Sequence, residues 1–116
     1  MTRPAVVLDL ERGARPGPSW RRLRAACGGG LAGAGFWTAA LCAHLPRRTG
    51  VWATVAEAGE AVGGLGWLET ARGPFRTLEA HHAGVPCDLL LHPDLDPARR
   101  RDVLAVLLGA WTAAGR

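Results

Sequence analysis

The sequence lacks five amino-acid types: it contains no Lys, Ile, Tyr, Asn or Gln, so all 14 of its basic residues are Arg. The missing types mostly have AT-rich codons, whereas the abundant Ala, Gly, Arg, Pro, Leu and Val have GC-rich codons. A GC-rich genome therefore explains much of the net charge of +4, so this charge is weak evidence about function. The absence of Lys excludes a Schiff base, a pyridoxal phosphate anchor and a P-loop lysine.

Motifs that bind metals, nucleotides or nucleic acids are also missing. Cys27, Cys42 and Cys87 have no CxxC or Cys/His zinc spacing, so we expect reduced, buried thiols in a cytoplasmic protein and no metal site. Gly28–Gly30 follows no strand and precedes no lysine, so it is better explained as a helix breaker than as a phosphate loop. The Arg residues form short clusters without a helix-turn-helix or RRM signature. We therefore expect no cofactor and no nucleic-acid partner.

One uncharged segment, residues 25–45, is long enough to span a bilayer. Its apolar character is mostly Ala, however, and its five glycines would weaken a spanning helix. We therefore expect no stable membrane insertion. The segment is predicted to be a soluble, broken helix, hinged at Gly28–Gly30 and buried through Phe36, Trp37 and Leu41.

A chain of 116 residues predicts a single domain, residues 1–116. Residues 49–66 are ambiguous: Val51, Ala53 and Val55 alternate as in a strand, but a capping box at Thr54 to Glu57 favours a helix over 55–62, which we prefer. The other predicted elements are a strand over 4–10, helices over 20–27 and 31–45, strands over 67–72, 75–82 and 85–92, and a helix over 97–114. This order predicts an α+β fold, a small antiparallel meander with helices packed on one face.

The last helix carries the strongest start signal, since Asp96 can cap it just before a proline. Its stretch 103–111 contains no formal charge, whereas an exposed amphipathic helix should show a polar stripe. We therefore expect it to be covered on more than one side. A homodimer with Leu104, Leu108 or Trp111 at the interface would provide the second cover.

One face of the predicted meander collects candidate catalytic groups. We expect Glu79 and Asp88 to lie nearly opposite each other across the second hairpin. His81, two residues after Glu79, lies on the same face of the sheet, and so does Arg72. Two facing carboxylates repel, so one can retain its proton, and a carboxylate beside a His is a plausible acid/base pair. Arg72 would stabilise an anion or a carbonyl. The alternative is an ordinary solvated face of the sheet.

The opposite face of the meander is the predicted core, and it contains polar residues as well. Glu69 shares this face with Trp67, and a buried carboxylate needs a partner, which Arg76 could supply. The functional interpretation places a substrate pocket at the rim of the core, walled by Trp67, with Glu69 and His82 as binding residues. His81 and His82 alone cannot hold a metal ion because adjacent strand residues point to opposite faces.

In length, GC-rich composition and lack of any cofactor motif, the chain resembles small tailoring proteins of actinobacterial peptide natural-product pathways. The family we name is the lysinoalanine-forming cyclase of cinnamycin-type and duramycin-type lanthipeptides. The resemblance implies cofactor-free addition of a peptide lysine amine to a dehydroalanine, and it maps no family residue onto this chain.

We therefore predict a cytoplasmic tailoring enzyme that binds a peptide or an amphipathic small molecule and promotes acid/base-assisted addition or cyclisation. The first alternative is a non-catalytic binding or regulatory module that docks a partner protein through a Trp/Arg surface. The second is a membrane-associated accessory protein that uses residues 25–45. An enclosed pocket with convergent polar groups would favour the enzyme, and a flat apolar patch would favour the docking module.

Overall fold

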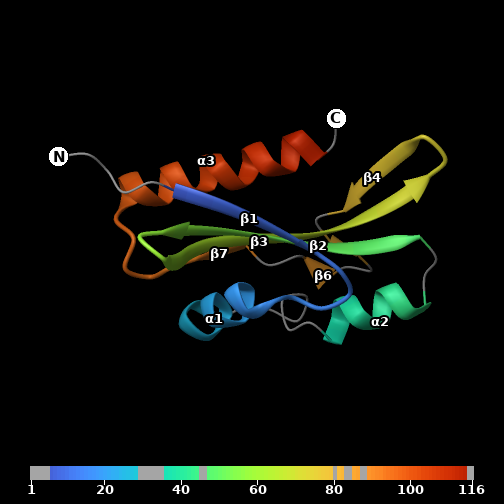
Figure 1. Ribbon diagram of the computed structural model, residues 1–116, viewed down its shortest axis with the longest axis horizontal. Coiled ribbons are helices and arrows are strands. Elements are labelled where there is room, and N and C mark those ends of the chain that lie inside the picture. Colours follow the sequence, from blue (N-terminus) through green and yellow to red (C-terminus); the bar gives the residue numbers. More distant parts are fainter. Residues whose placement is uncertain are drawn as a thin grey trace.

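Five strands form one antiparallel sheet in the order β1-β2-β3-β4, with β7 also paired to β3 (Figure 1). The computed structural model describes residues 6–28, 36–44, 47–79, 81–82, 85–86 and 89–114. The strands of the sheet are β1 (Val6–Arg12), β2 (Arg48–Glu57), β3 (Glu60–Arg72), β4 (Phe75–Glu79) and β7 (Leu89–Leu91). A separate ladder joins β5 (His81–His82) to β6 (Val85–Pro86), and the helices are α1 (Pro18–Cys27), α2 (Phe36–His44) and α3 (Pro97–Ala114).

The central strand β2 is apolar on both faces, and helices cover both. Val51 and Val55 belong to the core beneath α3, together with Leu107. Trp52, which follows Val51 in the sequence, points to the other face of the sheet and packs with Trp20 of α1. Figure 1 accordingly shows α3 on one side of the sheet and α1 and α2 on the other. The predicted α+β class with an antiparallel sheet is confirmed. The helices cover both faces of the sheet rather than the one face expected, since α1 covers part of the face expected to be solvated.

Four tryptophans form two edge-to-face pairs, one on each side of the sheet. Trp20 and Trp52 have ring centroids 5.1 Å apart beneath α1, and Trp67 and Trp111 have centroids 5.4 Å apart beneath α3. Such pairs contribute about 0.5–1.5 kcal/mol beyond their buried area. These indoles therefore anchor the helices.

Two consecutive glycines in β3 allow both helices to approach the sheet. A Cβ on Gly63 would lie 2.3 Å from Val103 of α3. A Cβ on Gly64, on the opposite face, would lie 2.8 Å from the ring of Trp20 and 2.9 Å from Leu23 in α1. These two glycines, which directly follow the stretch predicted as a helix over 55–62, therefore allow close packing within a strand.

The predicted helix over 55–62 is wrong. This stretch forms the end of β2, a tight turn and the start of β3. The turn residues Ala58 and Gly59 both have positive φ, 53° and 82°, as expected for a two-residue hairpin turn. Glu57, the second half of the supposed capping box, forms an ion pair with Arg99 of α3. Burial between two layers of helices outweighed a local capping signal that is worth about 1 kcal/mol.

The prediction of the meander is correct for its first hairpin and only partly correct for its second. Arg72 pairs with Phe75 across the predicted turn at residues 73–74, and β5 pairs with β6 across residues 83–84. The single strand predicted over 85–92 is wrong, because Leu89–Leu91 pairs with the first half of β3. Since β4 extends along only the second half of β3, the first half offers a free edge, and β7 occupies it with Leu90 buried.

Helix α3 has the predicted bounds, Pro97–Ala114. Asp96 caps it, since its Oδ1 accepts a hydrogen bond from the Arg99 backbone N–H at 2.8 Å. The strand predicted over 4–10 is present as β1, which within the described residues covers Val6–Arg12. These elements carry strong local signals at their ends.

The uncharged segment over 25–45 contains the end of α1 at Cys27 and the whole of α2. Residues 29–35, where the hinge was expected, lie outside the described part of the chain, as do the side chains of Phe36 and Trp37. Leu41 is half-buried. Among the helices described, none has the length and apolar character needed to cross a membrane.

Candidate functional site

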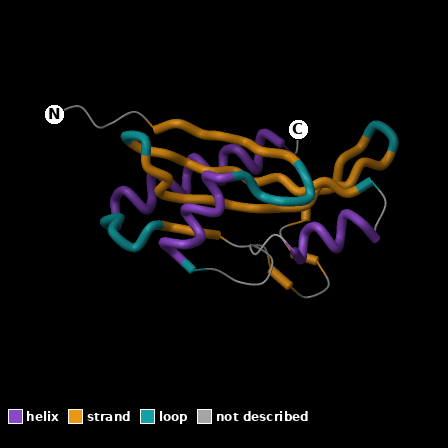
Figure 2. Tube along the Cα trace, turned by 60° about the horizontal axis from the view of Figure 1, so that its bottom comes forward, coloured by secondary structure: helices purple, strands orange, loops and turns teal. Residues whose placement is uncertain are grey.

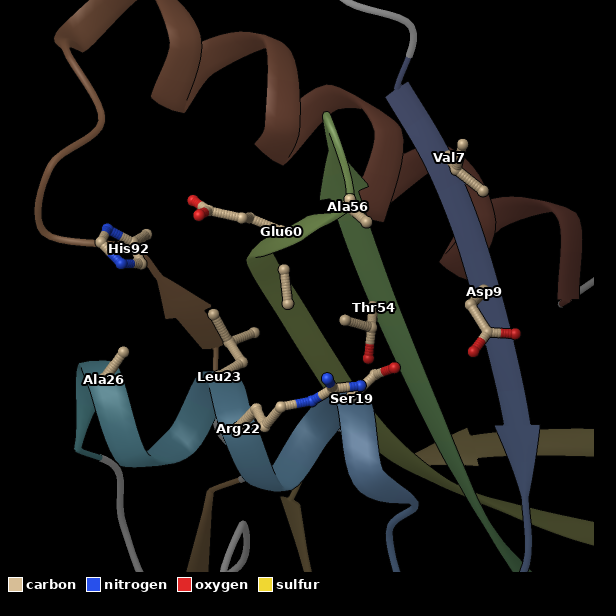
Figure 3. Close-up of a pocket in the computed structure, with 12 residues that line it drawn as sticks. Val7, Asp9, Ser19, Arg22, Leu23, Ala26, Thr54, Ala56, Glu60 and His92 are labelled. Atoms are coloured by element: carbon tan, nitrogen blue, oxygen red, sulfur yellow. The ribbon is translucent and has the colours of Figure 1, made fainter.

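A pocket of about 350 Å³ lies between α1 and the sheet, on the face opposite α3 (Figure 3). It exists because α1 crosses over β3 at Gly64, whereas β1 and the β2–β3 turn extend beyond the helix. Each neighbouring element contributes at least one polar group to it. The lining residues are Val7 and Asp9 of β1, Ser19, Arg22, Leu23 and Ala26 of α1, Thr54 and Ala56 of β2, Gly59, Glu60 and Ala61 at the β2–β3 turn, and His92 after β7.

Thr54 gives the pocket an unpaired polar group. Its side chain comes from the middle of β2 and points towards Ser19 in the first turn of α1 (Figure 3). The residue is only 2% exposed, and its Oγ1 has no hydrogen-bond partner in the described structure. A buried hydroxyl without a partner costs about 1–3 kcal/mol.

Three charged side chains reach the pocket from three different elements: Asp9 from β1, Arg22 from α1 and Glu60 from the start of β3. Within the ranges described, no other side chain forms an ion pair or hydrogen bond with any of them. The charges are therefore available to a ligand. With a neutral His92, these groups leave the pocket with an excess of one negative charge.

His92 is held in one orientation by the turn that precedes α3. Its Nδ1 accepts a hydrogen bond from the Asp94 backbone N–H at 3.2 Å, and the Asp94 carboxylate lies 3.8 Å from the same nitrogen. In the neutral ring the proton therefore resides on Nε2. Figure 3 shows the imidazole at the end of the pocket opposite Asp9, with Glu60 between them.

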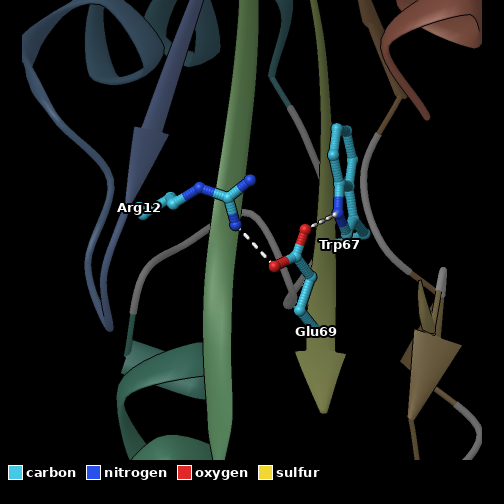
Figure 4. A network of polar contacts seen from close by, with 3 residues as sticks. All are labelled: Arg12, Trp67 and Glu69. Atoms are coloured by element: carbon cyan, nitrogen blue, oxygen red, sulfur yellow. Dashed lines mark hydrogen bonds and ion pairs between the residues drawn. The ribbon is translucent and has the colours of Figure 1, made fainter. Parts of the chain in front are cut away.

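A second polar cluster lies on the α3 face of the sheet (Figure 4). Glu69, 7% exposed, accepts hydrogen bonds from Arg12 of β1 at 2.5 Å and from the Trp67 indole N–H at 3.5 Å. Arg12 thus supplies the partner that we expected from Arg76. Because Trp67 is buried against Trp111, it belongs to the core, and the cluster holds β1 to β3 across β2. The pocket between α1 and the sheet is lined by neither Trp67 nor Glu69, so it is not the pocket that we predicted at the rim of the core.

The predicted catalytic residues lie on other segments. Glu79 is the last residue of β4 and pairs with Leu68, whereas His81 and His82 pair with Pro86 and Val85. Asp88, and with it the expected pairing of Glu79 and Asp88, lies outside the described residues, as do the side chains of Arg72, Glu79, His81 and His82. The proposed contact among Glu79, His81 and Asp88 therefore stays a prediction.

The pocket residues were missed because they come from segments far apart in the chain. Asp9 had one local signal, since it is the only acidic residue within the apolar strand predicted over 4–10. Arg22 looked like one member of an Arg cluster, and Thr54 looked like a helix cap. His92 is the last residue of the strand predicted over 85–92 and belongs to no motif. Only the packing of α1 on the sheet brings these four side chains to one cavity.

The two cysteines in the described part of the chain give no sign of a nucleophilic site. Cys27 and Cys42 are both free and half-buried, and Cys87 lies outside the described residues. Burial raises the pKa of the Cys27 thiol above its ordinary value. This thiol therefore stays protonated and weakly nucleophilic near neutral pH.

Comparison of the chain with protein-family models, with curated proteins and with solved structures finds no match. The functional argument therefore depends on the pocket and its side chains.

Proposed function

We propose that the pocket between α1 and the sheet binds a peptide segment or a small amphipathic molecule and promotes cofactor-free acid/base chemistry on it. The observation that carries this proposal is the convergence of Asp9, Arg22, Glu60 and His92 on a cavity of ligand size, in which no other described side chain pairs with Asp9, Arg22 or Glu60. The apolar floor, with Val7 and Leu23, suits an aliphatic group. The converging polar groups favour an enzyme over a flat docking surface. A cytoplasmic location stays a prediction from the free cysteines.

The polar groups can divide the chemistry between the two ends of the pocket. His92 presents Nε2–H and can stabilise a developing anion by donating a hydrogen bond to it, whereas Asp9 can accept the proton of an incoming nucleophile and return it, through solvent, to that anion. Arg22 lies between them and can stabilise a carbonyl oxygen as it gains charge. These roles suit addition to an activated double bond, with cyclisation when both partners belong to one peptide. The lysinoalanine cross-link implied by the resemblance is one such reaction.

A pair of matched threonines tests whether the Thr54 hydroxyl serves a ligand. Thr70, like Thr54, is a buried strand residue whose Oγ1 has no partner in the described structure, but it lies outside the pocket. Replacing either by Val removes an unpaired hydroxyl at nearly constant volume, so both variants should gain about 1 kcal/mol in unfolding free energy. Only Thr54→Val should weaken binding of pocket ligands.

Binding is measured by NMR titration with N-acetylated amino-acid amides and dipeptides, with the amide signals of Leu23, Thr54 and Ala61 as reporters. We expect shifts at these amides in the wild type and in Thr70→Val, and weaker binding in Thr54→Val. Equal affinity of both variants would remove Thr54 from the site. The absence of shifts for every probe at millimolar concentration would overturn the pocket proposal.

The docking module remains a second candidate, favoured by the apolar surface of β1. Val6, Val7, Leu8 and Leu10 are 41%, 60%, 38% and 44% exposed, respectively. Adjacent exposed apolar residues on a strand are typical of interaction sites. This observation moves the expected docking surface from the Trp/Arg residues to β1.

We also propose a homodimer through α3. Val103 and Leu107 are buried against the sheet, but Leu108 points away from it and is 51% exposed, with Leu104 and Trp111 half-buried beside it. A second copy packed on this side would cover Leu108. Light scattering at micromolar concentration should give a dimer for the wild type and a monomer for Leu108→Glu. A monomeric wild type would contradict the proposal.

A further inference from the structure

Strand β1 forms an edge of the main sheet, as Figure 2 shows for the strand nearest the N-terminus. In the described structure it pairs on one side only, with β2. Its first five residues, Val6 to Leu10, are all exposed. An edge strand of this kind presents unpaired backbone N–H and C=O groups along its outer side and can accept a further strand.

The ladder with β2 determines which groups face outward. Beyond the last paired residues, the Gly13 backbone N–H donates to the Gly50 carbonyl at 2.8 Å, and the pairing of β1 with β2 continues in the same register. In an antiparallel pair, hydrogen-bonded residues alternate with residues whose N–H and C=O point away. Val7, Asp9 and Glu11 therefore bond to β2, and the backbone groups of Leu8 and Leu10 point away from the sheet.

The same alternation decides where the side chains of an added strand would lie. Val7 and Asp9 line the pocket, so a residue paired with Asp9 projects on the pocket face. This position is a non-hydrogen-bonded pair, where facing side chains approach most closely. The neighbouring residues of the added strand would face Leu8 and Leu10 on the other side, where the exposed surface is apolar.

Charge selects among the possible occupants of this edge. Asp9 is the only charge among the first five residues of β1, and in the described structure no cation pairs with it. In a pairing of two β1 strands centred near Asp9, the two Asp9 carboxylates would lie opposite or diagonal to each other and repel. A cationic side chain would instead meet Asp9 and the excess negative charge of the pocket.

We propose that an extended peptide adds to β1 as an antiparallel strand and places a Lys or Arg side chain opposite Asp9, over the pocket. The backbone N–H and C=O groups of Leu8 and Leu10 form hydrogen bonds with the peptide, and the Asp9 carboxylate forms an ion pair with its cationic side chain. This assignment rests on the proposed function, because it names the substrate class of the same pocket. Strand addition also explains two features of β1 together, namely its exposed apolar residues and the unpaired Asp9.

The probe is the labelled pentapeptide acetyl-Thr-Val-Lys-Val-Thr-amide, with its Lys aligned to Asp9 and its two Val residues aligned to Leu8 and Leu10. Fluorescence anisotropy compares it with the norleucine and Glu versions and with a version N-methylated at both Val residues. We expect the Lys peptide to bind about fivefold more tightly than the norleucine peptide, as for a favourable surface ion pair, and the Glu peptide to bind more weakly than both. N-methylation should abolish binding, since it removes the peptide N–H groups that face β1.

Two isosteric variants separate the charge effect from the fold. Asp9→Asn should reduce the preference for Lys over norleucine to less than about twofold, the size left when an exposed ion pair is removed. Glu11→Gln, two residues along the same strand but outside the pocket lining, should keep the preference. Equal loss in both variants would overturn the assignment of charge recognition to Asp9.

The remaining outcomes separate this inference from the pocket proposal. Unchanged binding of the N-methylated peptide would overturn strand addition and leave the pocket proposal intact. Absence of peptide binding in a protein whose pocket amides still respond to the small probes would do the same. A dilution-dependent shift of the Leu8 and Leu10 amide signals without peptide would place a second copy on the edge and overturn the peptide assignment.

Discussion

Replacement of Gly64 by Ala should destabilise the protein, although Ala suits a strand better than Gly does. The added Cβ would lie 2.8 Å and 3.1 Å from two carbons of the Trp20 ring and 2.9 Å from the Leu23 methyl group. These side chains cannot swing aside into solvent, because Trp20 is 0% exposed and Leu23 is 1% exposed. Overpacking of this kind costs about 1–3 kcal/mol.

The backbone at Gly64 offsets part of that cost. Its φ lies outside the left-handed region, so Ala can adopt the conformation and reduces the entropy of the unfolded chain, which is worth about 0.4–1 kcal/mol. The net loss in unfolding free energy should therefore be about 1–2 kcal/mol, from the difference of the two contributions. Since Leu23 also lines the pocket, binding of pocket ligands should weaken as well.

Urea denaturation followed by tryptophan fluorescence and circular dichroism measures this change. The matched control is Gly109→Ala on α3, where an added Cβ would meet no atom within 4 Å. That variant should gain up to about 1 kcal/mol, the helix-propensity difference between Ala and Gly. The same substitution should thus have opposite signs at the two sites. A Gly64→Ala protein as stable as the wild type would refute the account of how α1 packs on β3.

Three further predictions concern single side chains. Glu69→Gln should cost about 1–3 kcal/mol in urea denaturation, because it leaves a neutral amide in a charge-assisted hydrogen bond with Arg12; an unchanged midpoint would show that the pair adds no stability. Asp96→Ala should cost about 1 kcal/mol through loss of the cap on α3, whereas the exposed Asp94→Ala should cost less, and equal losses would argue against the cap. Because burial raises its pKa, the Cys27 thiol should react with iodoacetamide more slowly than free cysteine at neutral pH and speed up only at higher pH; a rate equal to that of free cysteine would contradict this.

Local chemistry in the sequence determined the elements with strong end signals. Asp96 followed by a proline predicted the start of α3, and the β-branched run near the N-terminus predicted β1. Turn residues at 73–74 predicted the first hairpin of the meander. For the start of α3 and for the hairpin, the decisive interactions join residues that are close together in the chain, so the sequence contains them directly. For β1, the sequence contains only the strand propensity of its β-branched residues, and the pairing partner β2 is distant in the chain.

Tertiary packing decided the two elements that we misjudged. The stretch over 55–62 has both a strand pattern and a capping box, and burial between α3 and α1 selects the strand. The segment around Leu90 pairs with β3 because β4 leaves half of that strand uncovered. Such a choice depends on strand lengths elsewhere in the sheet, which no local pattern contains.

The sequence by itself determined which chemical groups are present: no lysine, no tyrosine, three cysteines and an acid in an apolar strand. The structure alone decided which of these groups meet. Asp9, Arg22, Thr54 and His92 are separated by long stretches of chain, and they share one cavity because Gly64 lets α1 lie close to β3. A site built from long-range contacts follows from the order of the strands and the packing of a helix, and these are properties of the folded chain as a whole.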